Sequence, residues 1–157
     1  METNYKEFTR ELIKKDLVTI GPETTFVEAR EIIQDKGITH LPVVDKHNNL
    51  VGLVSDRDIR EAGPSDASSL SILEINYLLV RLKVSSFMTP LDKLITINPD
   101  TPLEDAVQLM HDNKIGCLPV VEDGKLFGIF TETDALALLV DFLGRPLTLN
   151  ESLCSKV

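Results

Sequence analysis

The alternation of apolar and polar positions along the chain occurs twice, because residues 17–45 match residues 94–122 position by position. Each copy ends in the run Leu-Pro-Val-Val followed by an acid. One residue is then lost in the second copy, after which GLVSDRD at 52–58 aligns with GIFTETD at 128–134. Self-similarity over about fifty residues predicts two equivalent structural units.

Each copy predicts the element order β-α-β-β-α. A short apolar strand comes first, at 18–20 and again at 95–97. A helix follows in which apolar residues recur at spacings of three and four, and Gly37 is suited to end the first of these helices. In the second copy we expect Thr101 to be the N-cap, Pro102 the first helical residue and Glu104 the acid of a capping box.

Two β-branched strands joined by a short polar turn come next in each copy. The turns contain His-Asn-Asn and Glu-Asp-Gly, which is typical of β-hairpins. Ser55 and Thr131 then begin a second helix, and the helix in the second copy should stop at Gly144 and Pro146. A unit of this size cannot bury both faces alone, so the pattern predicts an α/β (α+β) fold in which two β-α-β-β-α repeats pack sheet to sheet.

The resulting domain boundaries are repeat 1 at 8–62, a linker at 63–86, repeat 2 at 87–143 and a C-terminal tail at 144–157. Within the linker, Ser71 and Glu74 form a capping-box pattern ahead of a mainly apolar short helix. This helix carries more apolar surface than an isolated linker needs. It therefore requires a partner, either the body of the protein or a second subunit.

The composition excludes several classes of function. The formal charge is −9 and the isoelectric point about 4.8, whereas nucleic-acid and anionic-membrane surfaces are bound by clustered Lys and Arg. No signal peptide or membrane-length apolar run is present, so we expect a soluble, cytoplasmic protein with no nucleic-acid or membrane partner. Cys117 and Cys154 show no metal-ligand spacing, and a reduced pair is expected.

The doubled phrase has two interpretations that are compatible with each other. Ser-x-x-Asp or Thr-x-x-Asp before an apolar helix is a capping box, which by itself only begins a helix. A glycine ahead of a helix N-terminus also lets a ligand approach the backbone, and the helix end favours a phosphate. An aspartate one turn inside can accept hydrogen bonds from a ribose diol. The phrase therefore suits a ribose with a phosphate nearby.

In combination, LPVVD, the G-h-h-[ST]-x-x-D phrase (h is apolar) and VSSFMTP before the second copy resemble a tandem pair of CBS domains, often called a Bateman module. The resemblance covers nearly all of residues 8–143. The stretch SDRDIREAGPSDASSLSILEINYLLVRLKV is similar to the acetoin-utilisation B-type proteins of this family. Many of those proteins carry a C-terminal ACT domain, which this sequence does not contain, so an amino-acid-sensing role is not expected.

The resemblance implies a bound adenine nucleotide (AMP, ADP or ATP), with S-adenosylmethionine or NAD as secondary candidates. It also implies two clefts related by a pseudo-twofold axis, each mixing segments of both repeats. Carried onto this sequence, one cleft uses Val18, Ile38, Thr39 and His40 with Ile129, Thr131 and Asp134. The other uses Thr89, Ile95, Ile115, Gly116 and Cys117 with Leu53, Ser55 and Asp58. This second cleft is the first choice for ligand binding, because the sequence FTRELIKKD replaces the Met-Thr-Pro lead in repeat 1.

The two copies differ where a phosphate is expected. His40 and Arg57 belong to repeat 1, while Cys117 and Thr133 occupy the matching positions of repeat 2. His40 and Arg57 could gather near one phosphate chain. The alternative is that His40 is an exposed residue at a strand end and that Arg57 is simply solvated.

Three functions follow from the sequence. The first is a regulatory module that senses an adenosine ligand, rearranges on binding, forms a homodimer and regulates an unidentified protein in trans. The second is a ligand-independent dimerisation or interaction scaffold with degenerate clefts. An enzyme is the third, and it is not expected, because the sequence contains no Ser-His-Asp arrangement, phosphate-binding P-loop or metal-ligand cluster.

Overall fold

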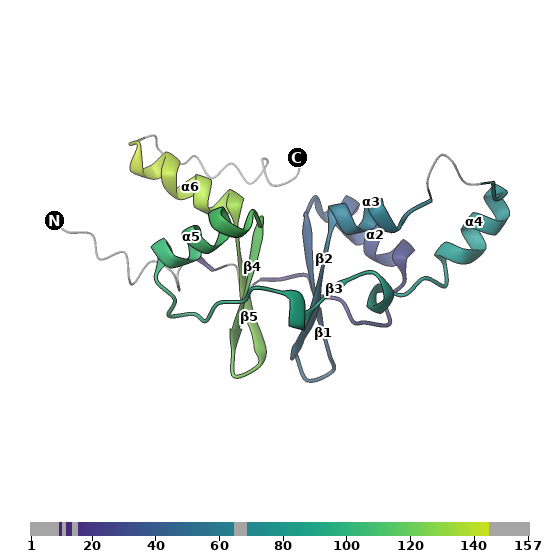
Figure 1. Cartoon of the computed structure of the whole chain (residues 1–157), viewed down its shortest axis with the longest axis horizontal. Helices are drawn as coiled ribbons and strands as arrows, with labels where there is room; N and C mark the ends of the chain where they lie inside the picture. The colour runs from purple at the N-terminus through teal and green to yellow at the C-terminus, as the bar shows by residue number, and fades with distance from the viewer. Residues whose placement is uncertain (1–9, 11, 14–15, 65–68, 145–157) are drawn as a thin grey trace. The chain divides into compact units, whose positions relative to one another are not determined.

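A computed structural model describes residues 10, 12–13, 16–64 and 69–144, which divide into two compact units (Figure 1). The repeat-1 unit consists of residues 18–94. The repeat-2 unit consists of residues 95–144 together with the described residues of 10–17. The predicted tail beyond Gly144, with Pro146 and Cys154, lies outside the described residues.

The repeat-1 unit contains a three-stranded antiparallel sheet in the order β1-β2-β3. Its elements are α2 (Phe26–Lys36), β1 (His40–Val44), β2 (Leu50–Ser55), α3 (Asp56–Ala62), α4 (Ile72–Leu79), the 3₁₀ turn η1 (Val84–Ser86), β3 (Thr89–Pro90) and the 3₁₀ turn η2 (Leu91–Lys93). The predicted hairpin is confirmed as β1 and β2, and Asn48 in its turn adopts a positive φ of 64°.

The repeat-2 unit has the same plan with a two-stranded sheet. Its elements are α5 (Leu103–Asn113), β4 (Cys117–Glu122), β5 (Lys125–Thr131) and α6 (Glu132–Phe142). The Asp123-Gly124 turn has positive φ at both residues, as expected for a tight two-residue hairpin. The mixed class of helices and small antiparallel sheets predicted from the sequence is thereby confirmed.

The first strand of each repeat is shorter than predicted. Instead of strands at 18–20 and 95–97, the structure has single parallel bridges from Ile20 to Val43 and from Ile97 to Val120. Ile20 donates its N–H to Pro42 O and accepts from Val44 N–H, at 3.1 and 2.9 Å. Pro22 and Pro99 follow two residues later in the two copies and restrict the backbone just before them, which is consistent with the early end of each strand.

One predicted helix cap is wrong. Thr101 does not cap α5; its Oγ1 accepts from Asn98 N–H at 3.1 Å and closes the preceding turn. The N-cap is Pro102, which makes no side-chain hydrogen bond, so the Thr101–Glu104 capping box does not form. In repeat 1 the cap is Thr25, with Glu28 completing the box. The predicted left-handed end of α2 at Gly37 is confirmed, with φ 61°.

Each unit buries its core between its helices and one face of its sheet. In the repeat-1 unit this core holds Phe26, Ala29 and Ile33 of α2, Ile59 of α3, and Leu41, Val43 and Val54 of the sheet, together with Ile20 and Val84. In the repeat-2 unit it holds Ala106 and Met110 of α5 with Leu118, Val120 and Phe130 of the sheet, and also Ile13 and Ile97. Alternate strand positions therefore point to the sheet face away from this core.

The segment leading into each repeat packs on the unit formed by the other repeat. Val84, in the lead to repeat 2, is fully buried in the repeat-1 core, and β3 extends the repeat-1 sheet. Ile13, in the lead to repeat 1, is 4% exposed and belongs to the repeat-2 core. The chain thus completes each unit with a piece from outside its repeat.

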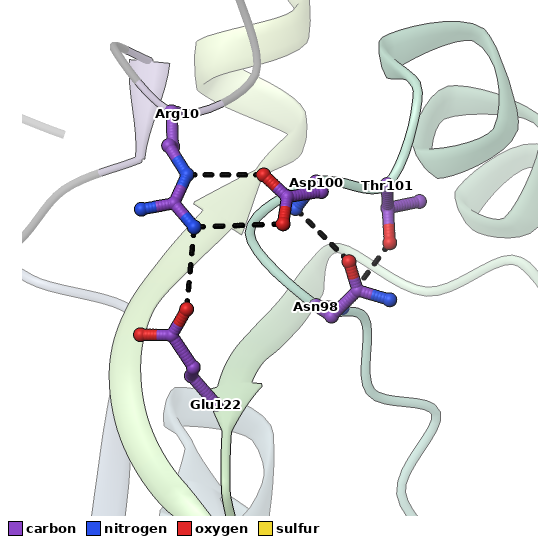
Figure 2. A network of polar contacts seen from close by, with 5 residues as sticks. All are labelled: Arg10, Asn98, Asp100, Thr101 and Glu122. Carbon is purple, nitrogen blue, oxygen red and sulfur yellow. Dashed lines mark hydrogen bonds and ion pairs between the residues drawn. The ribbon is translucent and has the colours of Figure 1, made fainter.

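A polar network holds the N-terminal lead on the repeat-2 unit (Figure 2). Arg10 donates from Nε and Nη2 to the Asp100 carboxylate at 3.1 and 3.5 Å, and from Nη2 to Glu122 Oε1 at 3.2 Å. These carboxylates, Asp100 first, raise the pKa of Arg10 above its ordinary value. The pairs are exposed, so we expect them to orient the segment more than to stabilise it.

No helix within the described ranges is long and apolar enough to cross a bilayer.

Candidate functional site

The doubled phrase forms two capping boxes with nearly the same geometry. Asp58 Oδ2 accepts from the N–H and the Oγ of Ser55, both at 2.7 Å. Asp134 Oδ2 accepts from the N–H and the Oγ1 of Thr131, at 2.8 and 2.6 Å. The cap uses one oxygen of each carboxylate, so the other oxygen takes no part in beginning the helix. The capping interpretation is confirmed, and it leaves the ribose interpretation open.

Strand register brings several predicted site residues onto one face of the repeat-1 sheet. His40 pairs with Ser55, Pro42 with Leu53, and Leu53 with Thr89. Paired residues, and residues two apart on a strand, point to the same side. His40, Leu53, Ser55 and Thr89 therefore share the face opposite the helical core, here called the half-site face.

The repeat-2 unit has a matching half-site face. Cys117 pairs with Thr131 and Pro119 with Ile129. Both Cys117 and Thr131 are buried, at 5% and 8% exposure, and Thr131 is the one buried polar side chain among the described residues. Its hydroxyl is satisfied by Asp134, as burial of a polar group requires.

Each predicted cleft takes residues from both units, and the clefts stay a prediction. The sequence assigned Thr39 and His40 to one cleft, and Ser55 and Asp58 to the other. All four belong to the repeat-1 unit, with Thr89, Val18, Ile38 and Leu53. The repeat-2 unit contains the remaining predicted residues: Ile95, Ile115, Gly116, Cys117, Ile129, Thr131 and Asp134. Strand pairing joins the residue before Leu-Pro to the hydroxyl residue within one repeat.

Gly52 in the doubled phrase makes room for the chain itself. A Cβ atom built at Gly52 would lie 2.5 Å from Met88 Sδ and 2.9 Å from Thr89 O. The glycine is therefore required for β3 to lie against β2, which brings Thr89 opposite Leu53. The sequence interpretation, that the glycine admits a ligand, is unnecessary at this position.

The junction between strand and second helix differs between the two units. Thr39 O accepts from Asp56 N–H at 2.9 Å, and Gly116 O accepts from Glu132 N–H at 3.0 Å. At Gly116 the carboxylate of Glu132 lies 3.4 to 3.6 Å from where a Cβ would stand, so the acid covers the glycine. The repeat-1 unit has instead a contact of 3.0 Å between Thr39 Oγ1 and His40 Nδ1.

Arg57 is held along its own helix. Its Nε donates to Glu61 Oε1 at 2.7 Å, one turn further along α3, and the side chain is 78% exposed. The hydrogen bond to Glu61 is the main cause that raises the pKa of Arg57 above its ordinary value. The guanidinium of Arg57 therefore pairs with Glu61 on the surface of α3. This agrees with the alternative from the sequence, in which Arg57 is a solvated side chain.

Two contributors were missed from the sequence. Met88 sets the spacing at Gly52, and Glu132 covers Gly116. Glu132 could have been identified from the sequence, because it directly follows the capping residue Thr131 and because the aligned residue of repeat 1 is the shorter acid Asp56. Met88 had none, since its contact depends on which strand β3 joins. Within the described part of the chain, no three or more His, Cys, Asp or Glu gather to hold a metal ion.

The family model for the CBS domain matches this chain twice, at residues 10–65 and 84–141. A CBS domain-containing protein from Dictyostelium discoideum is 35% identical over 139 residues, which cover 88% of this chain and 94% of that protein. An inosine-5′-monophosphate dehydrogenase from Methanocaldococcus jannaschii is 32% identical over 127 residues. The chain spans only 22% of the length of that enzyme.

Solved structures show the same fold. A candidate acetoin utilization protein (AcuB) from Vibrio cholerae superposes with a TM-score of 0.71 at 26% identity, covering 87% of this chain and 92% of that one. The CBS domain pair of protein MJ0100, in complex with 5′-methylthioadenosine and S-adenosyl-L-methionine, gives 0.69 at 27% identity, with 85% and 96% covered. CBSX2 in complex with AMP gives 0.69 at 30% identity, with 86% and 97% covered.

The family model matches the chain twice, and the structure shows the same plan in both units. The aspartate of the doubled phrase makes the same capping bonds in each unit. The chain belongs to the CBS-domain family as a tandem pair.

Proposed function

We propose that this protein is a regulatory module that binds an adenosine compound of the AMP, ADP or ATP type, with S-adenosylmethionine or NAD as secondary candidates. The observation that carries the proposal is the half-site face of the repeat-1 unit, where Thr89, His40, Ser55 and Asp58 belong to one sheet and the helix that follows it. Related CBS pairs have been crystallised with AMP and with S-adenosyl-L-methionine.

The residues have complementary roles in this proposal. The Asp58 oxygen that takes no part in the cap accepts from the ribose hydroxyls. The hydroxyl of Thr89 donates at the same face, and the Ser55 hydroxyl, whose proton goes to Asp58 Oδ2, accepts there. His40, held by Thr39 at 3.0 Å, meets the phosphate when it is protonated. The adenine contacts are supplied by backbone groups and apolar side chains such as Leu53, with the repeat-2 residues completing the clefts.

The two half-site faces should not bind equally. Glu132 places a carboxylate over Gly116, and a carboxylate repels a phosphate. His40 and Thr39 at the matching place offer a cation and a donor. The phosphate-bearing ligand is therefore proposed for the repeat-1 face, and a degenerate or phosphate-free site for the repeat-2 face.

Regulation would follow from a population shift. A ligand that contacts both repeats favours one relative arrangement of them over the other, by as much as its affinity for the two arrangements differs. The protein would act in the cytoplasm as a homodimer, in trans on a partner protein. A dimerisation scaffold without ligand is the competing function, favoured by Glu132 at the second face.

Calorimetric titration of the whole chain with AMP, ADP, ATP, NAD and S-adenosylmethionine tests the proposal. At least one nucleotide should bind, and Asp58→Asn should weaken it at least tenfold, about 1.4 kcal/mol. Asp134→Asn should affect that site less. Absence of binding by every compound at millimolar concentration would leave the scaffold as the function.

Asp58 also caps α3, so a matched control is needed. Glu28→Gln removes the acid from the capping box of α2, away from the half-site residues. It should leave nucleotide affinity unchanged. Equal weakening by Glu28→Gln and Asp58→Asn would mean that the aspartate acts only through helix stability, and the ribose role would be rejected.

A further inference from the structure

The two leads are fastened to their units by matching ion pairs. Arg10, in the N-terminal lead (the described residues of 10–17), pairs with Asp100 in the turn before α5 (Figure 2). Lys83, in the lead to repeat 2 (residues 82–90), pairs with Glu23 in the turn before α2. Asp100 and Glu23 occupy aligned positions of the two repeats. Each lead therefore places a base on the equivalent acid of the repeat to which it does not belong.

Behind its ion pair, the lead to repeat 2 is bonded to the repeat-1 unit through the backbone. Phe26 N–H donates to Leu82 O at 2.7 Å, and Val84 N–H donates to Thr24 O at 2.8 Å. The side chain of Val84 is fully buried, and β3 continues the attachment by pairing with β2. This lead can therefore leave only if part of the sheet and part of the core open with it.

The described residues of the N-terminal lead are held on the repeat-2 unit by side chains. No backbone hydrogen bond joins these residues to the described residues of 95–144. Arg10 forms ion pairs with Asp100 and Glu122, and its Cζ lies 5.5 Å from the centroid of the Phe127 ring. Ile13 inserts into the repeat-2 core. The attachment thus depends mainly on one guanidinium group and one buried apolar side chain.

The two attachments differ in how much water reaches them. The side chain of Arg10 is 47% exposed, and those of Asp100 and Glu122 are 77% and 47% exposed. Exposed ion pairs contribute little to stability and are screened by salt. Segments with few buried contacts open locally, at a smaller cost than unfolding of the whole domain. We therefore expect the N-terminal lead to open more often than the lead to repeat 2.

Release of the N-terminal lead would remove one of two chain connections between the units. The chain passes from the repeat-2 unit to the repeat-1 unit between Leu17 and Val18, and it returns between Leu94 and Ile95. With the N-terminal lead in place, both connections join the units. Without it, only the connection at Leu94 and Ile95 remains. The two units would then have the freedom that a rearrangement between them requires.

We propose that the N-terminal lead is a releasable strap: Arg10 and Ile13 leave the repeat-2 unit together, while the lead to repeat 2 stays bonded to the repeat-1 unit. The ion pairs of Arg10 set how often the strap opens. Ile13 brings the strap back, because its release exposes apolar surface of the repeat-2 core to water.

Thiol labelling of the whole chain, in a Cys154→Ser background, compares the two leads. Ile13→Cys and Val84→Cys each place a thiol at a buried position, 4% and 0% exposed in the native side chains. Peptide mass spectrometry after reaction with N-ethylmaleimide distinguishes these thiols from Cys117. The thiol of Ile13→Cys should react at least tenfold faster than that of Val84→Cys, with urea denaturation showing that both variants are folded. Equal rates would overturn the proposal.

Removal of the basic groups tests the part played by the ion pairs. Arg10→Gln should accelerate labelling of Ile13→Cys at least threefold. Lys83→Gln is the matched control and should leave labelling of Val84→Cys unchanged, because the backbone bonds remain. Raising the salt concentration from about 0.05 M to about 0.5 M should act as Arg10→Gln does and add little to it. No acceleration by Arg10→Gln, or an equal acceleration by Lys83→Gln, would reject the strap.

Limited digestion with trypsin tests the chain without an introduced thiol. Cleavage needs a locally opened segment, so trypsin should cut after Arg10 before it cuts after Arg81 or Lys83. The opposite order would contradict the proposal. None of these experiments contains a nucleotide, so the strap is tested independently of the ligand proposed above.

Discussion

The two repeats fill equivalent cores with differently placed aromatic rings. In the repeat-1 unit the ring is Phe26 on α2, and the aligned strand position is Val54. In the repeat-2 unit the helix position is Leu103 and the strand position is Phe130. The aromatic ring thus lies on the helix in repeat 1 and on the sheet in repeat 2. The two pairs of side chains, Phe with Val and Leu with Phe, differ in size by only one methylene group. Packing therefore requires a filled volume more than a particular residue at each position.

The doubled phrase behaves differently from the core. Its capping bonds have almost the same lengths in both units, 2.7 and 2.7 Å at Asp58 against 2.8 and 2.6 Å at Asp134. A hydrogen bond depends on distance and angle between particular atoms, so few substitutions keep it. A ribose contact would impose the same demand. The two repeats therefore differ in their core residues, where filling the same volume is enough. They agree at the capping boxes, where particular atoms must lie at hydrogen-bonding distance.

The largest expected effect is in the cores. Phe26→Ala and Phe130→Ala should each lower the free energy of unfolding by about 3–5 kcal/mol, because each ring is almost fully buried. Urea denaturation followed by circular dichroism measures this. Phe26→Leu with Val54→Phe transfers the repeat-2 arrangement into repeat 1, and should cost less than the sum of the single changes. Strict additivity would mean that the two positions do not share one volume.

The next effect concerns the glycine of the doubled phrase. Gly52→Ala should destabilise the protein by about 1–3 kcal/mol, because its Cβ meets Met88 and the Thr89 carbonyl. Gly116→Ala is the matched control, since its Cβ meets only the movable end of Glu132, and it should change stability little. Thermal unfolding of both variants decides; equal melting temperatures would contradict the close β2–β3 approach.

A smaller effect is expected where the first helix of each repeat ends. Gly37 and Lys114 both adopt the left-handed conformation, with φ of 61° and 53°. Gly37→Ala should therefore cost about 1 kcal/mol, whereas Lys114→Gly should stabilise by a similar amount. Chemical denaturation measures both. Destabilisation by Lys114→Gly would show that the lysine side chain contributes more than its backbone strain costs.

The smallest effect is the pH response of one cap. Hydrogen bonds from the Thr25 backbone and hydroxyl lower the pKa of Glu28 below its ordinary value of 4.5. A lowered pKa means that this cap stabilises α2 above pH 4.5 and that its contribution is lost as the pH falls through the folded-state pKa. A side-chain NMR titration should find the Glu28 pKa below 4.5, and Thr25→Val should raise it. An unchanged pKa in Thr25→Val would leave the backbone N–H as the whole cause. Helix α5, capped by Pro102, has no such acid-sensitive side-chain cap.

Local features were predicted well because neighbouring residues determine them. The hairpins, the Ser55–Asp58, Ser71–Glu74 and Thr131–Asp134 boxes and the left-handed end of α2 all involve residues close in sequence. The prediction that Thr101 caps α5 was wrong because closing the preceding turn and capping the helix are tasks of adjacent positions, and a hydroxyl suits both. Thr24 and Thr101 both accept a backbone N–H to close a turn, and the cap belongs to the residue after each of them.

Long-range features were not readable from pattern. Strand register pairs His40 with Ser55, a pairing that the sequence prediction did not state. The segments that lead into the two repeats contain apolar residues, but the sequence does not say which core these residues join. Only the structure assigns Val84 to the repeat-1 core and Ile13 to the repeat-2 core. Such assignments depend on which surfaces meet after the chain has turned back, and hydrophobic periodicity holds no information about that.

The sequence by itself determined that there are two β-α-β-β-α units, where the second helix of each unit begins, and that a hydroxyl and an aspartate recur at that helix. These properties follow from turn chemistry and from periodicity within a few residues. Only the tertiary structure decided that Met88 packs against Gly52, that Thr89 joins the repeat-1 sheet and that α4 (Ile72–Leu79) leaves most of its apolar side chains exposed. Each of these depends on contacts between residues far apart along the chain, which form only when whole elements pack.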